Sequence, residues 1–242
     1  MKLNDIAALE KQYYSPVFSR APVCFARGED VYLHDTEGRR YTDFLSGIAT
    51  CCLGYSDAGF KQVLHGAVDT LLHTSNLFYV EAQAKAAQAL CGATGFDNVF
   101  FSNSGAEAVE GALKLARKHH YAAGRPRAHY VTLLGSFHGR TLATLAATGQ
   151  EKFHEPYRPL PESFSHVPPG DVAALEAAVT EDTAAVIADG GILAGHPPRL
   201  RRARRADDSG RNSDGHGPHG RDDSLSGAGR AARRAGAREV PG

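Results

Sequence analysis

A turn between an apolar segment and a helix-like segment holds the residues best suited to bind an anion. Residues 100–108 read Phe-Phe-Ser-Asn-Ser-Gly-Ala-Glu-Ala, and Ser104 and Gly105 stand where a helix would begin. The first N–H groups of a helix have no partner within it, and the helix dipole makes this end positive, so a phosphate is favoured there. Gly105 permits close backbone approach, and Ser104 adds a hydroxyl donor. The pattern fits an ordinary capping box of Ser104 and Glu107 equally well, so both interpretations stay open at this point.

A second turn, over residues 135–141, combines an aromatic ring with a guanidinium group. It reads Gly-Ser-Phe-His-Gly-Arg-Thr and follows the apolar segment 130–134. Phe137 can stack on a flat ring, and the planar fork of Arg140 can bind a carboxylate through two parallel hydrogen bonds. The alternative is a solvated turn that contributes one aromatic residue to the core.

Alternating strand-like and helix-like segments position these two turns. Residues 30–33 and 40–44 flank a turn-rich segment and predict a hairpin. The hydrophobic periodicity predicts helices over 57–72, 81–93, the segment after 104, 139–147 and 171–179, and strands over 98–102, 130–134, 164–167 and 184–188. Strands that alternate with helices indicate an α/β protein with a mostly parallel sheet.

Composition excludes several other classes of protein. The 242 residues are 42% apolar with a formal net charge of zero, so nothing global indicates a nucleic-acid partner. The four cysteines lack metal-ligand spacing, and the adjacent Cys51 and Cys52 argue against a disulfide framework. No segment has the apolar length of a signal core or a membrane span. We therefore expect a soluble cytoplasmic protein with no metal, membrane or nucleic-acid partner.

Taken together, four segments resemble the class III pyridoxal-phosphate-dependent aminotransferases. They are residues 43–50 (DFLSGIAT), 73–79 (HTSNLFY), 100–108 and 135–153. Segment 73–79 is most similar to the acetylornithine/succinyldiaminopimelate aminotransferase branch, and the resemblance runs from residue 13 to residue 188. It implies fold-type I architecture, a pyridoxal 5′-phosphate cofactor and a homodimer. It also implies amino transfer between N-acetylornithine and 2-oxoglutarate in arginine or lysine biosynthesis.

The resemblance assigns roles to individual residues and outweighs the two local alternatives. The cofactor is expected to contact Ser104, Gly105, Ala106, Phe137 and His138, the first three at its phosphate and Phe137 on its pyridine ring. The substrate is expected to contact Arg140 through its α-carboxylate and to pass Ser46 and Gly47 at the entrance of the site. Segment 73–79 is expected near the dimer interface.

The family's chemistry also needs an acid at the ring nitrogen and a lysine that bonds the cofactor and moves a proton. The resemblance places both after the strand expected at 184–188. Here that strand runs directly into Asp-Gly-Gly-Ile at 189–192, and all seven lysines lie at or before Lys152. We therefore expect no catalytic residue in this chain, no covalent link to the cofactor at the usual site, and no activity.

The last fifty residues differ in character from the rest. Residues 193–242 contain eleven arginines and six acids, but no lysine, threonine or aromatic residue. Such a segment cannot bury enough apolar surface to offset its ordering entropy, so we expect disorder, caused by a reading-frame shift near codon 189. The alternative is a basic tail that binds RNA or an acidic partner, although the segment has no aromatic residue to stack on bases.

The expected organisation is an incomplete fold-type I transferase. Residues 1–55 would belong to the small domain, 56–189 to a partial cofactor-binding domain with a mixed, mostly parallel sheet, and 190–242 to the disordered tail. Three alternatives remain for function. One is a non-catalytic fragment that binds phosphate ligands or a partner subunit, and another is a class III relative that uses ornithine or 4-aminobutyrate. The third is a degraded gene product that does not fold stably.

Overall fold

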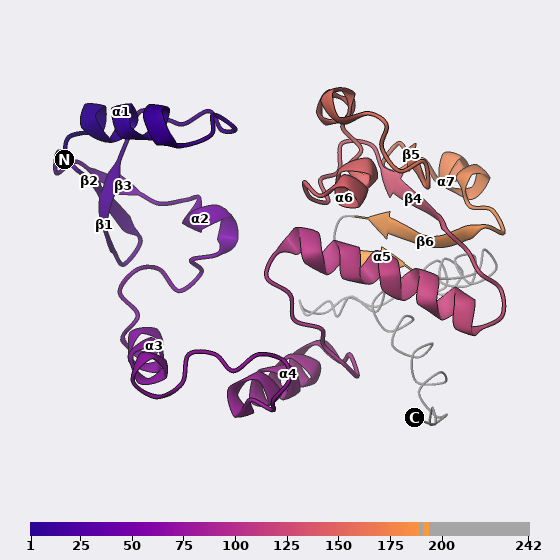
Figure 1. Cartoon of the computed structure of the whole chain (residues 1–242), viewed down its shortest axis with the longest axis horizontal. Helices are drawn as coiled ribbons and strands as arrows, with labels where there is room; N and C mark the ends of the chain where they lie inside the picture. The colour runs from indigo at the N-terminus through magenta and orange to yellow at the C-terminus, as the bar shows by residue number, and fades with distance from the viewer. Residues whose placement is uncertain (189–190, 194–242) are drawn as a thin grey trace, which may run out of the picture. The chain divides into compact units, whose positions relative to one another are not determined.

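The computed structural model describes residues 1–188 and 191–193 in two compact units, Met1–Val80 and a second unit that begins at Glu81 (Figure 1). Each unit is described by itself. The predictions for the tail fall almost entirely outside the described residues. The predicted domain boundary at residue 55 stays a prediction.

The first unit contains a three-stranded antiparallel sheet in the order β1-β2-β3. The strands are β1 Phe25–Glu29, β2 Tyr32–Asp35 and β3 Arg40–Thr42. The pairing of β2 with β3 confirms the predicted hairpin, whereas β1 was not predicted. A buried carboxylate, Asp35, closes the hairpin by accepting hydrogen bonds from the Arg39 side chain (2.7 Å), two backbone N–H groups and the Tyr41 hydroxyl (3.0 Å). Burial raises the pKa of Asp35, but these hydrogen bonds outweigh it and lower the pKa to about 2.

Three helices complete the first unit: α1 Leu3–Tyr13, α2 Ser46–Ala49 and α3 Ala58–Thr70. The last confirms the helix predicted over 57–72, and it begins at Asp57, whose carboxylate accepts the Phe60 N–H at 2.6 Å. Its predicted apolar face is exposed in this unit, since Val63 is 69% and Leu64 50% accessible.

The second unit contains a four-stranded sheet in the order β5-β4-β6-β7. Its strands are β4 His129–Leu133, β5 Phe164–Val167, β6 Thr183–Ala188 and β7 Gly191–Leu193. The first three run parallel and β7 pairs antiparallel with β6, so the sheet is mixed and mostly parallel, as predicted. All but the last residue of β6 are buried, which is the pattern of a strand covered on both faces.

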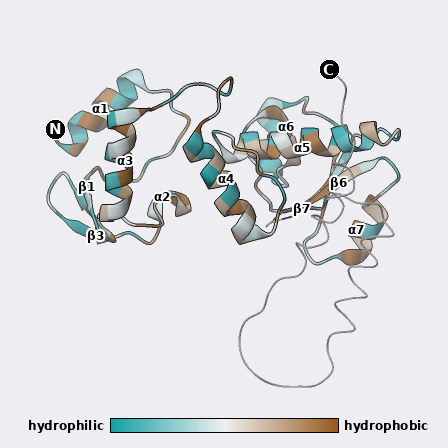
Figure 2. Cartoon of the chain, turned by 90° about the horizontal axis from the view of Figure 1, so that it is seen from below, coloured by the Kyte–Doolittle hydropathy of each residue, from teal (hydrophilic) through white to brown (hydrophobic). Residues whose placement is uncertain are grey.

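Helices cover both faces of this sheet (Figure 1). On one face α5, Gly105–Ala122, packs Leu113 and Ala116 against Tyr130, Ala185 and Ile187. On the other face α7, Val172–Ala178, covers a smaller cluster built on Val131, Val167 and Val186. Figure 2 shows both hydrophobic and hydrophilic residues along α5, as expected for a helix with one buried face. The remaining elements are α4 Glu81–Thr94, α6 Leu142–Ala147 and two 3₁₀ turns, Glu151–Phe153 and Glu155–Tyr157.

The strand predicted over residues 98–102 is wrong, because this segment has no regular structure. A strand needs a hydrogen-bonded neighbour, and in the described part of the chain this segment pairs with neither edge of the sheet. The apolar side chain of Phe100 instead lies over α5, where a Cβ built on Gly111 would come within 3.2 Å of its ring. Among the described residues no helix is both long and apolar enough to cross a membrane.

Candidate active site

The N-terminus of α5 is capped by the residues that the sequence singled out. The Ser104 hydroxyl oxygen accepts the Glu107 N–H at 3.2 Å, and the Glu107 carboxylate accepts the Asn103 N–H at 2.6 Å. The capping interpretation is therefore confirmed. It does not exclude an anion, because the Ser104 hydroxyl still has its hydrogen to donate and the N–H groups of Gly105 and Ala106 belong to the first turn.

Open space lies beside this helix end. A Cβ built on Gly105 meets no atom within 4 Å among the described residues, and Ser104 and Gly105 are exposed. Hydroxyl and backbone N–H donors at a positive helix end are the donor set that a phosphate requires. The Glu107 carboxylate opposes an anion here, and it is hydrogen-bonded to the Asn103 N–H at 2.6 Å.

The second predicted turn follows the carboxyl end of β4 and is held by segment 148–150. The His138 N–H donates to the Thr148 hydroxyl at 3.0 Å. The Gln150 side-chain amide donates to the carbonyl oxygens of Gly135 at 3.3 Å and Ser136 at 3.0 Å. The turn starts at Gly135, whose φ of +79° suits glycine. These hydrogen bonds fix the backbone on both sides of Phe137.

The structure brings the two predicted turns into direct contact at Gly139. A Cβ built on Gly139 would lie 2.8 Å from the Ala106 Cβ and 2.5 Å from the Thr144 hydroxyl oxygen. Its φ of +137° also lies in a region that side-chain-bearing residues avoid. Only glycine therefore lets the turn lie against the first residues of α5. The N-terminus of α5 and the turn that carries Phe137 and Arg140 therefore lie against each other.

Two side chains of this turn remain available to a ligand. Phe137 is 55% exposed, so the alternative of a core aromatic residue is wrong. The guanidinium carbon of Arg140 lies 5.3 Å from the centroid of the Phe137 ring and 4.0 Å from that of Phe153. Stacking on a ring face leaves the N–H groups at the edge of the guanidinium free to bind a carboxylate. His138 is buried beneath the turn.

The predicted substrate residues Ser46 and Gly47 lie in the first unit. Asp43 positions them by accepting the backbone N–H groups of Leu45 and Ser46 at 2.9 Å each and the Tyr55 hydroxyl at 2.6 Å. These hydrogen bonds lower the pKa of Asp43, and the one from Tyr55 raises the pKa of that phenol to about 12. Ser46 and Gly47 both have positive φ, at 47° and 61°. Their role at the substrate entrance stays a prediction.

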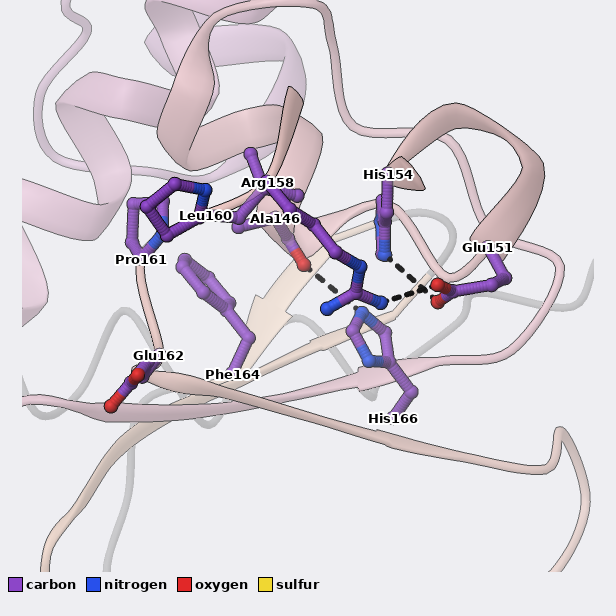
Figure 3. Close-up of a pocket in the computed structure, with 10 residues that line it drawn as sticks. Ala146, Glu151, His154, Arg158, Leu160, Pro161, Glu162, Phe164 and His166 are labelled. Atoms are coloured by element: carbon purple, nitrogen blue, oxygen red, sulfur yellow. Dashed lines mark hydrogen bonds and ion pairs between the residues drawn. The ribbon is translucent and has the colours of Figure 1, made fainter. Parts of the chain in front are cut away.

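Two cavities lie away from the predicted residues. One, of about 560 Å³, is lined by ten residues between Ala146 and His166, and Figure 3 shows Glu151 joined to both His154 and Arg158. The Glu151 carboxylate lies 3.4 Å from His154 Nδ1 and accepts a hydrogen bond from Arg158, so its charge is balanced within this loop. The other cavity, of about 570 Å³, lies by His129 and Asp182 at the amino ends of the parallel strands. Ligands of parallel sheets bind at the carboxyl ends, which is where the two predicted turns lie.

Sequence reasoning missed the residues that join the two turns. Glu110, Thr141 and Thr144 form hydrogen bonds between α5 and the start of α6, and Phe153 supports Arg140. The available signal was Gly139, a glycine between histidine and arginine in a turn, which indicates close approach of another backbone or side chain. In the described residues no cluster of three or more His, Cys, Asp or Glu could hold a metal ion.

Comparison with known proteins agrees with this arrangement. Residues 13–195 match the family model of the class III aminotransferases. The acetylornithine aminotransferase of Agrobacterium fabrum is 46% identical over 183 residues, which are 73% of this chain and 46% of that protein. That of Gloeobacter violaceus is 44% identical over 201 residues, which are 81% of this chain and 50% of that protein. The chain thus spans about half the length of the curated relatives that it matches.

Solved structures show the same fold. The ornithine aminotransferase of Toxoplasma gondii superposes with a TM-score of 0.74 at 27% identity, over 86% of this chain and 52% of that one. An aminotransferase of Bacillus anthracis superposes with a TM-score of 0.65 at 31% identity, over 70% of this chain and 40% of that one. The fold is that of the fold-type I aminotransferases, as predicted. This chain belongs to the class III aminotransferases, a family that depends on pyridoxal phosphate.

Proposed function

We propose that this chain is the cofactor-recognising part of an aminotransferase that acts on N-acetylornithine and 2-oxoglutarate. The observation that carries the proposal is the contact of Gly139 with Ala106, which joins the α5 helix end to the turn with Phe137 and Arg140. The identities of 44–46% with two acetylornithine aminotransferases favour N-acetylornithine as the amino donor over ornithine or 4-aminobutyrate.

The residues present fit the phosphate and the flat ring of pyridoxal phosphate. Ser104, Gly105 and Ala106 would hold the phosphate at the end of α5, where the space beside Gly105 is open. The half-exposed Phe137 would lie against the pyridine ring, with His138 beneath the turn. When bound, this cofactor supplies a ring that accepts the electron pair left by loss of the substrate α-proton.

Arg140 would hold the α-carboxylate of the substrate. Its guanidinium carbon lies 4.0 Å from the centroid of the Phe153 ring, and the planar group can offer two parallel N–H groups to a carboxylate. Because the group is already oriented, less conformational entropy is lost when a carboxylate binds. Ser46 and Gly47 would line the substrate entrance.

We further propose that these 242 residues bind the cofactor without transferring amino groups. All seven lysines lie at or before Lys152, and six of the seven belong to α1, α3, α4 and α5 or to the N-terminal cap of α1. Lys152 lies near the site, with its ammonium 4.8 Å from the Phe153 ring that Arg140 covers. Lys152 is exposed to solvent, whereas a lysine that bonds a cofactor is held within the site. Without a lysine that bonds the cofactor, the chain would act as a non-catalytic phosphate-binding or partner-binding subunit.

We propose that the partner is a second copy of this chain. We also propose that the protein is cytoplasmic. The support is the exposure of the apolar side chains in segment 73–79, where Leu77 is 86% and Phe78 68% accessible in the first unit. Contiguous exposed apolar side chains mark protein interfaces. Sedimentation of the purified chain over a range of concentrations measures this association, and a monomer at all concentrations would contradict it.

Pyridoxal phosphate and borohydride together test the proposed function. We expect calorimetry to show binding of pyridoxal phosphate that is lost when the phosphate is removed from the probe, as in pyridoxal. After borohydride reduction, peptide mapping should show no single preferred lysine. A stoichiometric adduct at one lysine, Lys152 included, would overturn the proposed lack of catalysis. Equal affinities for pyridoxal phosphate and pyridoxal would overturn the phosphate site at α5.

A further inference from the structure

We propose that Glu110 and Thr141 are positioning residues that lock the Phe137–Arg140 turn onto the phosphate-binding end of α5. The inference rests on the proposed function, because it concerns how the two halves of the cofactor site are kept in register. Neither residue is expected to touch the ligand. Each acts through the turn that carries Phe137 and Arg140.

The bond between the two elements is direct. The Thr141 hydroxyl lies 2.5 Å from the Glu110 Oε1 atom, and the residues are separated by 31 positions in the sequence. An ionised carboxylate has no hydrogen to donate, so the Thr141 hydroxyl must be the donor. Hydrogen bonds to a charged acceptor are shorter and about twice as strong as neutral ones. The Thr141–Glu110 bond is therefore a short hydrogen bond that links the turn directly to α5.

A buried hydroxyl extends this link into the core of the unit. The Thr144 side chain is 0% exposed, and its hydroxyl oxygen lies 2.8 Å from that of Thr141. The Thr144 hydroxyl also donates to the Thr141 carbonyl oxygen at 3.2 Å. The Thr144 hydroxyl oxygen accepts the Thr141 N–H at 3.1 Å. Hydrogen bonds thus connect Thr144 to Thr141, and Thr141 to Glu110.

This chain of hydrogen bonds and the Gly139 contact act on the same turn. Gly139 lies against Ala106 and Thr144, while Thr141, two residues later, is tied to Glu110. Ala106 and Glu110 are four residues apart on α5 and so share one face of the helix. The turn is thereby held at two points along the same face. Phe137 and Arg140 consequently keep a fixed distance from the N–H groups that would bind the phosphate.

A ligand that contacts both the helix end and the Phe137 ring should bind more weakly when this link is removed. A ligand that contacts only the helix end should bind with unchanged affinity. Pyridoxine 5′-phosphate is the two-point probe, because it has the ring and the phosphate but no aldehyde that could react with surface lysines. Inorganic phosphate is the one-point probe. Thr141→Val removes the hydroxyl at nearly constant shape, and Thr141→Ser keeps it.

We expect Thr141→Val and Glu110→Ala each to weaken pyridoxine 5′-phosphate binding about fivefold to tenfold, which is the range for losing one partly exposed hydrogen bond to a charge. Inorganic phosphate should bind all forms within about twofold, because its donors lie on α5 alone. Thr141→Ser should restore the affinity for pyridoxine 5′-phosphate. The double variant should lose no more than either single one, since both changes break the same bond. Lys118→Ala, on the same helix but away from the turn, is the matched control.

Hydrogen exchange provides a readout that needs no ligand. Amides of residues 135–140 should exchange faster in Thr141→Val than in Thr141→Ser, with the amides of β4 unchanged. Equal affinities of Thr141→Val and the unchanged chain for pyridoxine 5′-phosphate, with equal exchange, would overturn the inference and leave the proposed function standing. Failure of the unchanged chain to bind either probe would overturn the proposed function, and the inference with it.

Discussion

Replacing Gly139 by alanine tests most directly whether the two turns form one site. The built Cβ would lie 2.5 Å from the Thr144 hydroxyl oxygen, 2.8 Å from the Ala106 Cβ and 2.9 Å from the Thr144 Cβ. Normal carbon–carbon contacts are about 3.5–4.0 Å, so at least two neighbours must move. Thr144 cannot move at low cost, because it is 0% exposed and hydrogen-bonded to Thr141.

The expected cost has two parts. Holding alanine at a φ of +137° costs about 1–3 kcal/mol of backbone strain. Forcing a methyl group into a packed site costs about a further 1–3 kcal/mol. We therefore expect Gly139→Ala to lower the free energy of unfolding of the second unit by about 2–6 kcal/mol. The folded fraction of Gly139→Ala should also bind pyridoxine 5′-phosphate more weakly than the unchanged chain, because the turn is displaced from α5.

Gly135→Ala is the matched control in the same turn. Its φ of +79° is also positive, but a Cβ built there meets nothing within 4 Å. This variant therefore carries the backbone strain of about 1–2 kcal/mol without the overlap. Urea unfolding followed by circular dichroism measures the free energy of unfolding of both variants. Hydrogen exchange of α5 and β4 assigns the change to the second unit. Equal destabilisation by the two variants would refute the argument that Gly139 is needed for close approach.

Three further predictions concern other groups. Gly105→Ala should reduce phosphate binding at least about tenfold by filling the open space at the helix end, which calorimetry measures. Melting curves should show little change in thermal stability, because Ala is a better helix former than Gly. The carboxyl of Asp35 should titrate near pH 2 by NMR, so the stability that it contributes is complete above its usual pKa of 3.8 and is lost as the pH falls through about 2, whereas Asp35→Asn should remove this dependence. Burial lowers the pKa of His166, so the stability linked to its neutral form is present above the usual pKa of 6.5 and is lost as the pH falls below it. The free energy of unfolding should therefore differ less between about pH 5.5 and 7.5 in His166→Gln than in the unchanged chain.

The sequence predicted the elements whose hydrophobic period is strong. The helix with Leu113 and Ala116 on one face and the fully apolar strand at 184–188 both appear where expected, because burial on a sheet sets their pattern. The segment 98–102 was misread because a short apolar run has the same composition whether it pairs in a sheet or packs on a helix. In the structure, Phe100 contacts α5 at Gly111 while remaining 76% exposed, and its segment does not pair in a sheet.

The candidate site was predictable in its parts but not in its connection. Ser104 and Gly105 are recognisable from the end of an apolar segment followed by a helix, and Phe137 and Arg140 from the turn that follows the next strand. The bond from Thr141 to Glu110 joins residues 31 positions apart. No local pattern encodes such a pair, because its formation depends on how α5 crosses the sheet. Gly139 was visible as a glycine, but what it approaches was not.

The way in which the site is assembled separates recognition of the cofactor from its use. Four contacts that shape the two turns in the described part of the chain join residues between Asn103 and Phe153: the cap at Ser104, the approach at Gly139, the bond from Thr141 to Glu110, and the contact of Arg140 with Phe153. None of these contacts involves a lysine. A binding site held together in this way does not need the reactive amine in order to form. The proposed affinity for the phosphate-bearing ring can therefore be measured on this chain separately from any capacity to transfer an amino group.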